Sequence, residues 1–379
     1  MVFVFYFLII KKEIYTITKE DGMKNGIRKI IIFTAIVLGV ILALLIGFIL
    51  FLSITEFKPG AAGPVPLENN PAILPETGKT VSVLSMNIGY GSLDKNQDFF
   101  MDGGNTIRPD SDKNVKANMK EIRDFFLREN ADVYFLQEVD AHSRRSYYMN
   151  QVEYLAEGSP GSTAFAYNFK VRYVPIPLKE PIGRVESGLL MMNRFRADKA
   201  ERVSLPVPFT WPVRTANLKR CILVERVPVK DSGRELVLVN LHLEAYDDGE
   251  GKAAQTRVLM DLLNAEYAKG NYCIAGGDFN QTFPGVDHGK FPIIDTDFFT
   301  PGTLSPEMLN PGWQFAFDGN TPSCRLLNKP YSGTPAGNQF YIIDGFIISP
   351  NVELVSVRTI DMNFAYSDHN PVRLEARLK

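Results

Sequence analysis

Acids, amides and imidazoles recur along this chain at points where short apolar segments end. At the carboxyl end, Asp368 and His369 stand side by side before the alternating segment 372–378, which predicts a final strand. Adjacent residues of an extended chain point in opposite directions, so we expect these two side chains to contact different partners. Alone, the Ser-Asp-His triplet is a weak signal, because such polar residues before a strand most often form a solvated turn.

Five further apolar segments end in, or are interrupted by, residues of the same types. In chain order, the residues at these points are Asn87, Glu138, Asn240 with His242, Asp278 with Asn280, and Asp344. Glu138 ends a buried run, where a charge is costly unless it meets a cation, so we predict that it binds a metal. Asp344 requires a partner, either the adjacent backbone or an imidazole. Taken alone, Asn87 is equally explained as a turn cap, and His242 as a core histidine bonded to a backbone carbonyl.

The segments that must position these residues show the periodicities of strands and helices. Alternating and apolar runs predict strands over 80–87, 131–140, 165–174, 187–192, 218–227, 235–243, 271–278 and 338–349, with a hairpin turn at Asp231. Apolar residues at helical spacing predict helices over 115–128 and 251–269, and a shorter one over 143–156. Residues 282–338 are rich in Pro and Gly, so we expect long loops near a substrate groove.

Composition excludes several classes of protein. The three cysteines lie far apart without a Cys-x-x-Cys spacing, which argues against a zinc site and a disulfide framework. Residues 1–29 hold six Lys and Arg against three Asp and Glu, so the remaining residues carry 35 basic and 40 acidic side chains. A domain that grips duplex DNA without sequence preference is usually basic, and this one is not.

The amino-terminal part predicts a membrane anchor. Residues 30–54 form an uncharged apolar run that exceeds the ~20 residues needed to cross a bilayer. Lys24, Arg28 and Lys29 precede it, which favours a cytoplasmic amino terminus and an outward-facing remainder. We therefore predict a cytoplasmic segment (1–29), a transmembrane signal anchor (30–54), a linker rich in Pro and Gly (55–79) and a folded domain (80–379). A cleaved signal peptide is the alternative, and translation could start at Met1 or at Met23.

The polar positions together resemble a known family. Ser-Met-Asn87, Leu-Gln-Glu138, Asn240-Leu-His242-Leu, Gly-Gly-Asp278-Phe-Asn280, Ile-Ile-Asp344 and Ser-Asp368-His369-Asn-Pro stand in the order of the endonuclease/exonuclease/phosphatase superfamily, which includes deoxyribonuclease I-like enzymes. The resemblance covers residues 80–379. It implies an α/β fold, a four-layer α-β-β-α sandwich of two mostly antiparallel sheets, with the site at one end of the sheets.

The resemblance also implies roles for individual residues. Glu138 would be the main ligand of a metal, supported by Asn87 and Asp368; hard oxygen ligands of this kind suit Mg²⁺ or Mn²⁺. Asp278 would orient or deprotonate the attacking water, and Asn280 would hold a phosphate oxygen. His369, oriented by Asp344, would contact the phosphate, and His242 would donate to it or to the leaving group. Whether Asp278 or His369 takes the proton stays open. Further residues expected to bind substrate are Asn240, Arg108 and Glu186, the last where some family members carry a glutamate that orients the histidine matched by His242.

These observations predict a membrane-anchored, outward-facing, Mg²⁺-dependent enzyme that hydrolyses a phosphodiester or phosphomonoester. Its substrate would be a lipid headgroup, an envelope polymer or nucleic acid, and no obligate protein partner is implied. The acidic domain weighs against an extracellular nuclease, which is the nearest enzymatic alternative. A catalytically silent binding module on the same fold is the alternative of another class.

Overall fold

The computed structural model describes residues 25–379 except 158, 160, 248, 335 and 336, and the chain divides into two compact units between Thr55 and Glu56. In the first unit, α2 (Asn25–Ile54) is one continuous helix, and Gly26–Ile54 is long and apolar enough to cross a membrane. A signal sequence would satisfy the same criteria. The apolar run at residues 1–10, Met23 and Lys24 lie outside the described residues.

The second unit contains a seven-stranded sheet that carries half of the predicted polar positions. All its neighbouring strands are antiparallel except β8 and β9, which are parallel. Its strands are, in spatial order, β1 (Ala62–Val65), β6 (Lys199–Ser204), β7 (Cys221–Pro228), β8 (Glu235–His242), β9 (Tyr272–Asp278), β15 (Asp344–Ile348) and β12 (Gln314–Ala316).

A six-stranded sheet carries the other half. Here too the pairs are antiparallel with one exception, the parallel pair of β2 and β3. Its strands are, in spatial order, β16 (Val352–Thr359), β17 (Val372–Leu378), β2 (Thr80–Asn87), β3 (Val133–Asp140), β5 (Gly183–Asn193) and β4 (Ser162–Val174). Two small pairs complete the strands: β10 (Gln281–Thr282) with β11 (Gly302–Thr303), and β13 (Cys324–Arg325) with β14 (Phe340–Tyr341).

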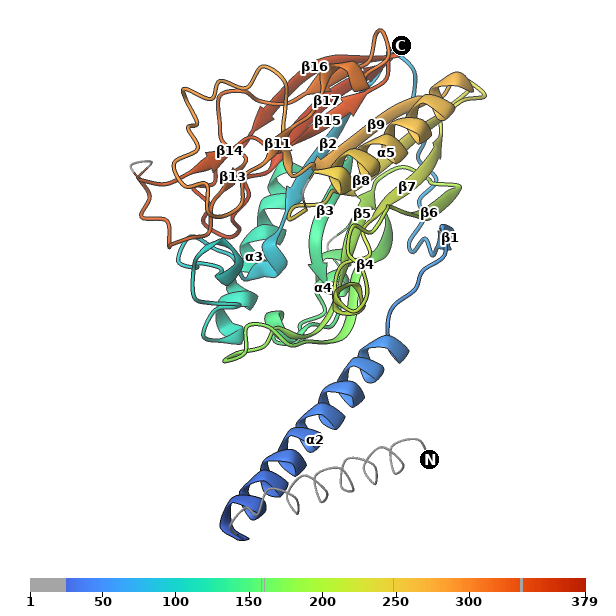
Figure 1. Cartoon of the computed structure of the whole chain (residues 1–379). Helices are drawn as coiled ribbons and strands as arrows, with labels where there is room; N and C mark the ends of the chain where they lie inside the picture. The colour runs from blue at the N-terminus through green and yellow to red at the C-terminus, as the bar shows by residue number, and fades with distance from the viewer. Residues whose placement is uncertain (1–24, 158, 160, 248, 335–336) are drawn as a thin grey trace. The chain divides into compact units, whose positions relative to one another are not determined.

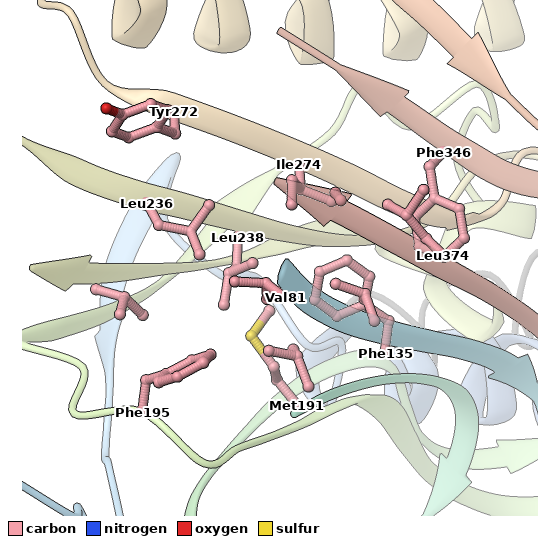
Figure 2. Packing of buried hydrophobic residues seen from close by; sticks show 14 of the residues in the cluster. Val81, Phe135, Met191, Phe195, Leu236, Leu238, Tyr272, Ile274, Phe346 and Leu374 are labelled. Atoms are coloured by element: carbon pink, nitrogen blue, oxygen red, sulfur yellow. The ribbon is translucent and has the colours of Figure 1, made fainter. Parts of the chain in front are cut away.

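The two large sheets pack face to face, with helices on their outer faces (Figure 1). Alternate residues of each strand fill different layers: Val133 and Phe135 of β3 enter the core between the sheets, and Tyr134 and Leu136 face the helix α3 (Asp112–Glu129). Figure 2 shows the inter-sheet core, where Phe135 and Phe346 approach with ring centroids 6.4 Å apart. The outer face of the other sheet is covered by α5 (Glu250–Ala268), which contributes Leu259 and Leu263. The predicted four-layer sandwich is confirmed.

Shorter elements connect these layers. α4 (Gln151–Ala156) packs Leu155 against the same cluster as α3. Five 3₁₀ turns lie in the connections: η1 (Gly89–Gly91), η2 (Phe100–Asp102), η3 (Arg144–Ser146), η4 (Val213–Ala216) and η5 (Pro306–Met308). Residues 282–338 contain only short elements, as expected for long loops.

The structure differs from the sequence-based expectations at three places. The expected linker, 55–79, packs on the domain: β1 pairs with β6, and Asn70 Nδ2 donates to the carbonyl of Ala197 at 2.6 Å. The expected helix over 143–156 is divided into η3 and α4, because Tyr147 and Tyr148 adopt positive φ. The expected strand over 338–349 is likewise divided, into β14 and β15. The strands β6 and β16 were not predicted, and neither were β1 or the short strands β10, β11, β12 and β13.

Candidate active site

Strand direction gathers the predicted polar residues at one edge of both sheets. Parallel neighbours end at the same edge, so β2 and β3 bring Asn87 and Glu138 together, and β8 and β9 bring His242 and Asp278 together. Antiparallel neighbours start where these strands end. The start of β15 therefore adds Asp344 beside β9, and the residues before β17 add Asp368 and His369 beside β2.

Strand register places three of these residues in one row. His242 is paired with Asp278, and Asp278 with Asp344, across three adjacent strands. Asp278 Oδ2 lies 3.4 Å from His242 Nε2 and 3.8 Å from His369 Nε2, and it accepts a hydrogen bond of 3.2 Å from Asn87 Nδ2. Its other oxygen accepts from the backbone N–H of Asn280 at 2.8 Å. Burial and the neighbouring Asp344 carboxylate raise the pKa of Asp278 to about 7.

His369 is fixed by carboxylates. Its Nδ1 lies 2.8 Å from Asp344 Oδ2, and its Nε2 faces Asp278 and, at 3.9 Å, Asp368. Burial opposes protonation, but Asp344 and Asp368 outweigh it and raise the pKa of His369 well above its ordinary value. These carboxylates therefore favour the protonated ring, whose Nε2 faces Asp278 and Asp368.

His242 has the opposite character. Burial and the nearby guanidinium of Arg220 lower the pKa of His242 far below its ordinary value, so the ring is neutral. Its Nδ1 is buried and has no hydrogen-bond partner among the described residues. The site thus contains two imidazoles whose pKa values are shifted in opposite directions, both within 4 Å of the same Asp278 oxygen.

Glu138 is positioned by an irregularity of β3. One extra residue interrupts its pairing with β5 between Leu136 and Val139, and Glu138 adopts a φ of 55° there. A positive φ is costly for a non-glycine residue, and such strain is concentrated at functional sites. The bulge turns the carboxylate toward the site, where Oε1 accepts from Asn87 Nδ2 at 3.2 Å.

The donor set fits a hard divalent cation better than a soft one. Burial and the like charge of Glu138 raise the pKa of Asp368 to about 6 against the opposing effect of His369, and a bound cation would relieve this repulsion. Cys324 lies within 4.8 Å of Asp368 and His369 ligand atoms, and burial raises the pKa of its thiol to about 12. The Asn87 oxygen accepts from the Gly89 N–H at 3.0 Å, and its Nδ2 bridges the carboxylates of Glu138 and Asp278 at 3.2 Å.

These side chains line one side of a cavity of about 360 Å³. The lining also has an apolar part, the apolar wall, which includes Phe169, Val174, Ile182, Phe209 and Leu218. Such a combination of an apolar wall with a few convergent polar groups is typical of small-molecule sites.

Three buried arginines also line this cavity, and they were missed at the level of sequence: Arg145, Arg220 and Arg325. Arg145 binds Asp140 at 2.9 Å, lies 3.8 Å from Glu138 and stacks over the Tyr90 ring at 3.7 Å. It follows Arg144 in a polar stretch, which by its composition resembles a solvated surface. The sequence signal that could have indicated a buried arginine is Asp140. This acid stands at the end of a buried strand and therefore requires a cation.

Asn240 does not fit the expected role in substrate binding. Its Nδ2 donates to the carbonyls of Leu136 and Leu190, at 3.1 and 3.0 Å, and its oxygen accepts from Gln137 at 2.7 Å. The side chain is fully buried and fastens one sheet to the other.

Arg108 and Glu186 also lie outside the cavity lining. Arg108 pairs with Glu180 at 3.1 Å, and Glu186 pairs with Arg184 at 3.0 Å, so Glu186 does not orient His242. The adjacent Ser187 lines the cavity instead, because neighbouring strand residues face opposite sides. Asn280 does line the cavity, with its Nδ2 bonded to the carbonyl of Leu243 at 2.8 Å.

Comparison with solved structures supports the fold. An endonuclease/exonuclease/phosphatase from Beutenbergia cavernae is 18% identical, with a TM-score of 0.54 over 79% of this chain and 72% of that chain. One from Bacteroides vulgatus is 16% identical, with a TM-score of 0.50 over 79% and 100% of the two chains. TDP2 from D. rerio, solved with a single-strand DNA product, is 15% identical, with a TM-score of 0.48 over 79% and 99%.

Comparison with curated proteins gives no match. The sequence model of the Endonuclease/Exonuclease/phosphatase family matches residues 84–369, a span that begins within β2 and ends at His369. Members of this family are hydrolases that act on phosphate esters. With the sandwich fold and this match across most of its length, the chain belongs to the endonuclease/exonuclease/phosphatase family.

Proposed function

We propose that this protein is a membrane-anchored, outward-facing, Mg²⁺-dependent phosphoesterase that hydrolyses a phosphodiester or phosphomonoester. The observation that carries the proposal is the pair of imidazoles, His242 and His369, whose Nε2 atoms lie 3.4 and 3.8 Å from the same carboxylate oxygen of Asp278 at the wall of the cavity. In the reaction, the oxygen of water forms a bond to phosphorus, the bond from phosphorus to the ester oxygen breaks, and the departing oxygen receives a proton.

Asp278 is the residue best placed to take the proton of the attacking water. Its Oδ2 faces both imidazoles, and its Oδ1 is fixed by the Asn280 N–H, so the carboxylate is held in one orientation. A base is most effective when its pKa lies close to the working pH.

His369 is less suited to be that base, because the neighbouring carboxylates raise its pKa and so favour its protonated form. Its Nε2–H would instead donate to a non-bridging oxygen of the phosphate and stabilise the charge that develops there. His242 would donate from Nε2 to the phosphate or to the leaving oxygen.

Glu138 and Asp368 are the residues that would hold Mg²⁺. When bound, the cation would supply charge stabilisation at the phosphoryl and leaving oxygens. The protein's contribution is to aim Glu138 through the bulge of β3 and to keep it hydrogen-bonded to Asn87.

Membrane anchoring rests on α2. The helix is apolar from Ile30 to Ile54, and Arg28 and Lys29 stand at its start, which favours retention of that end in the cytoplasm. The domain would then lie outside the cell. Protease added to intact cells should release residues 56–379 if this orientation is correct, and a protected domain would contradict it.

The activity is tested with the full chain in detergent, supplied with Mg²⁺ or with EDTA. Bis-p-nitrophenyl phosphate, p-nitrophenyl phosphate, plasmid DNA and sphingomyelin are offered in parallel, with His369→Ala as the blank. Metal-dependent turnover of at least one substrate, abolished in the variant, is expected. Turnover of DNA alone would identify a nuclease. Absence of turnover with all four substrates would contradict the proposed function.

A further inference from the structure

Two loops of the domain carry large apolar side chains in solvent. The end of β4 exposes Tyr173, and the connection from β4 to β5 exposes Ile176 and Leu178, the last 88% exposed. The connection from β6 to β7 exposes Val207, Trp211 and Val213. Among the described residues of 56–379, these are six of the fourteen large apolar side chains with such exposure. Scattered apolar residues need no explanation, whereas a group confined to two loops indicates a binding surface.

The same two loops form the apolar wall of the active-site cavity. Ile176 and Ile182 line it from the first loop, and Phe209 and Leu218 from the second. The loops are joined near their bases, where Lys219 N donates to the carbonyl of Asn168 at 2.7 Å and Leu218 packs against the cluster of Val174 and Ile182. An apolar path therefore continues from the exposed loop residues to the reacting groups.

The second loop binds Glu56, the first residue of the folded unit, through two ion pairs. Glu56 binds Lys219 at 3.3 Å and Arg214 at 3.4 Å, both in the β6–β7 connection. Ile54, the last residue of α2, precedes Glu56 by two residues, and two residues span at most about 7 Å. The residues that follow, 62–65, are paired with β6, so no long tether intervenes.

The side chains of these loops suit a lipid surface. Trp211 is 59% exposed, and tryptophan prefers the boundary between water and the acyl chains. Lys58 and Arg214, 62% and 47% exposed, stand beside the Glu56 contact and can attract anionic headgroups. A nucleic-acid strand would instead need cations along these loops, where Leu178 is the most exposed of the large apolar residues.

We propose that the connections β4–β5 and β6–β7 dock the mouth of the active site on the outer surface of the bilayer, and that the substrate is a phosphate-ester lipid. The apolar wall of the cavity takes the part of the lipid next to its phosphate. This inference rests on the proposed function, because it assumes that α2 remains as an anchor and that the site hydrolyses phosphate esters.

Docking is measured by the fluorescence of the full chain in vesicles of phosphatidylcholine and phosphatidylglycerol. The sequence has two tryptophans, and Trp313 is buried against Tyr267, so Trp313→Phe leaves Trp211 as the single reporter. Brominated acyl chains should quench the fluorescence of Trp211. The emission maximum of Trp211 in the bilayer should also lie at a shorter wavelength than that of the same variant after unfolding by urea in detergent-free nanodiscs. Trp211→Phe provides the matched control, in which Trp313 should stay unquenched. An unquenched Trp211 in the bilayer would overturn the proposal.

The preference for lipid substrates is tested with the double variant Leu178→Ser/Trp211→Ser. Neither Leu178 nor Trp211 lines the cavity. Its turnover of sphingomyelin and phosphatidylglycerol in the vesicles should fall roughly tenfold, as expected for loss of two inserted apolar side chains. Its turnover of bis-p-nitrophenyl phosphate should be unchanged. Leu127→Ser is the control: the residue is 57% exposed on α3, just before β3 begins, at the opposite end of that strand from Glu138.

The outcomes separate the two proposals. Loss of lipid turnover with intact turnover of the soluble diester supports the docking surface. Equal turnover of lipid in wild type and double variant, or hydrolysis of DNA in preference to lipid, overturns it while the phosphoesterase stands. If the wild type hydrolyses no ester at all, the proposed function has failed, and quenching of Trp211 still decides whether the loops dock.

Discussion

The 2.8 Å hydrogen bond between His369 Nδ1 and Asp344 Oδ2 joins the two large sheets, since Asp344 begins β15 of one and His369 precedes β17 of the other. The catalytic imidazole is therefore oriented by a residue of the opposite sheet. Asp344→Asn removes the carboxylate that raises the pKa of His369, so this pKa should fall.

Turnover of bis-p-nitrophenyl phosphate by Asp344→Asn should fall on the order of a hundredfold. The chain has four histidines, so an NMR titration can follow each ring separately. His288→Gln serves as the control, and it should leave the His369 titration and the turnover unchanged. An unaltered His369 pKa in Asp344→Asn would contradict the assigned partnership.

Removing the carboxylate of Glu138 should weaken Mg²⁺ binding. Glu138→Gln keeps the shape of the side chain and its acceptor for Asn87, but it loses the charge that a hard cation prefers. Calorimetric titration with Mg²⁺ should show a loss of affinity of roughly tenfold or more, about 1.4 kcal/mol. Glu153→Gln, on the exposed side of α4, should bind as the wild type does, and equal affinity in both variants would remove Glu138 from the metal site.

Arg145 should be required for stability as well as for activity. Arg145→Met leaves the Asp140 carboxylate buried without its cation, which typically costs about 3–5 kcal/mol. Urea denaturation should show this loss, and Asp140→Asn combined with Arg145→Met should recover part of it. If the double variant is no more stable than Arg145→Met, the ion pair is not the cause.

Glu225 gives the domain a pH-dependent stability that is unrelated to catalysis. Its carboxyl lies in the inter-sheet layer, where one oxygen is bonded to Asn193 at 3.0 Å and the other has no partner among the described residues. Burial raises its pKa from 4.5 to about 7. The fold therefore favours the neutral acid: its contribution is complete below pH 4.5 and is lost as the pH rises through 7.

Glu225→Gln imitates the neutral acid, so it should match the wild type in thermal unfolding at pH 4.5. At pH 8 it should be more stable, on the order of 3 kcal/mol in unfolding free energy. Parallel pH profiles for the two proteins would show that Glu225 ionises in the fold without cost.

Much of the site could be predicted because strand ends are local features of the sequence. Asn87, Asp278 and His242 occupy the last residues of strands whose alternation is visible over eight residues or fewer, and parallel pairing gathers those ends. The same reasoning predicted a partner for Asp344, because an acid in an apolar strand requires one.

The remaining assignments depend on contacts between distant segments. Asn240 shares a face with His242 but lies two residues deeper, where carbonyls of the other sheet occupy its amide. Glu186 differs from the cavity residue Ser187 by one position, and one position reverses the face of a strand. β1 is a strand because β6 lies beside it, and its four residues carry no alternation that predicts this.

Because the hydrogen bond between Asp344 and His369 joins the two sheets, the rate of the reaction depends on how the sheets are positioned relative to each other. A sideways slip at the Phe135–Phe346 contact would part the imidazole from its carboxylate while every strand kept its own ladder of hydrogen bonds. On warming, activity should therefore be lost at a lower temperature than the β structure detected by circular dichroism. Replacing Phe346 with a smaller residue should increase the difference between these two temperatures.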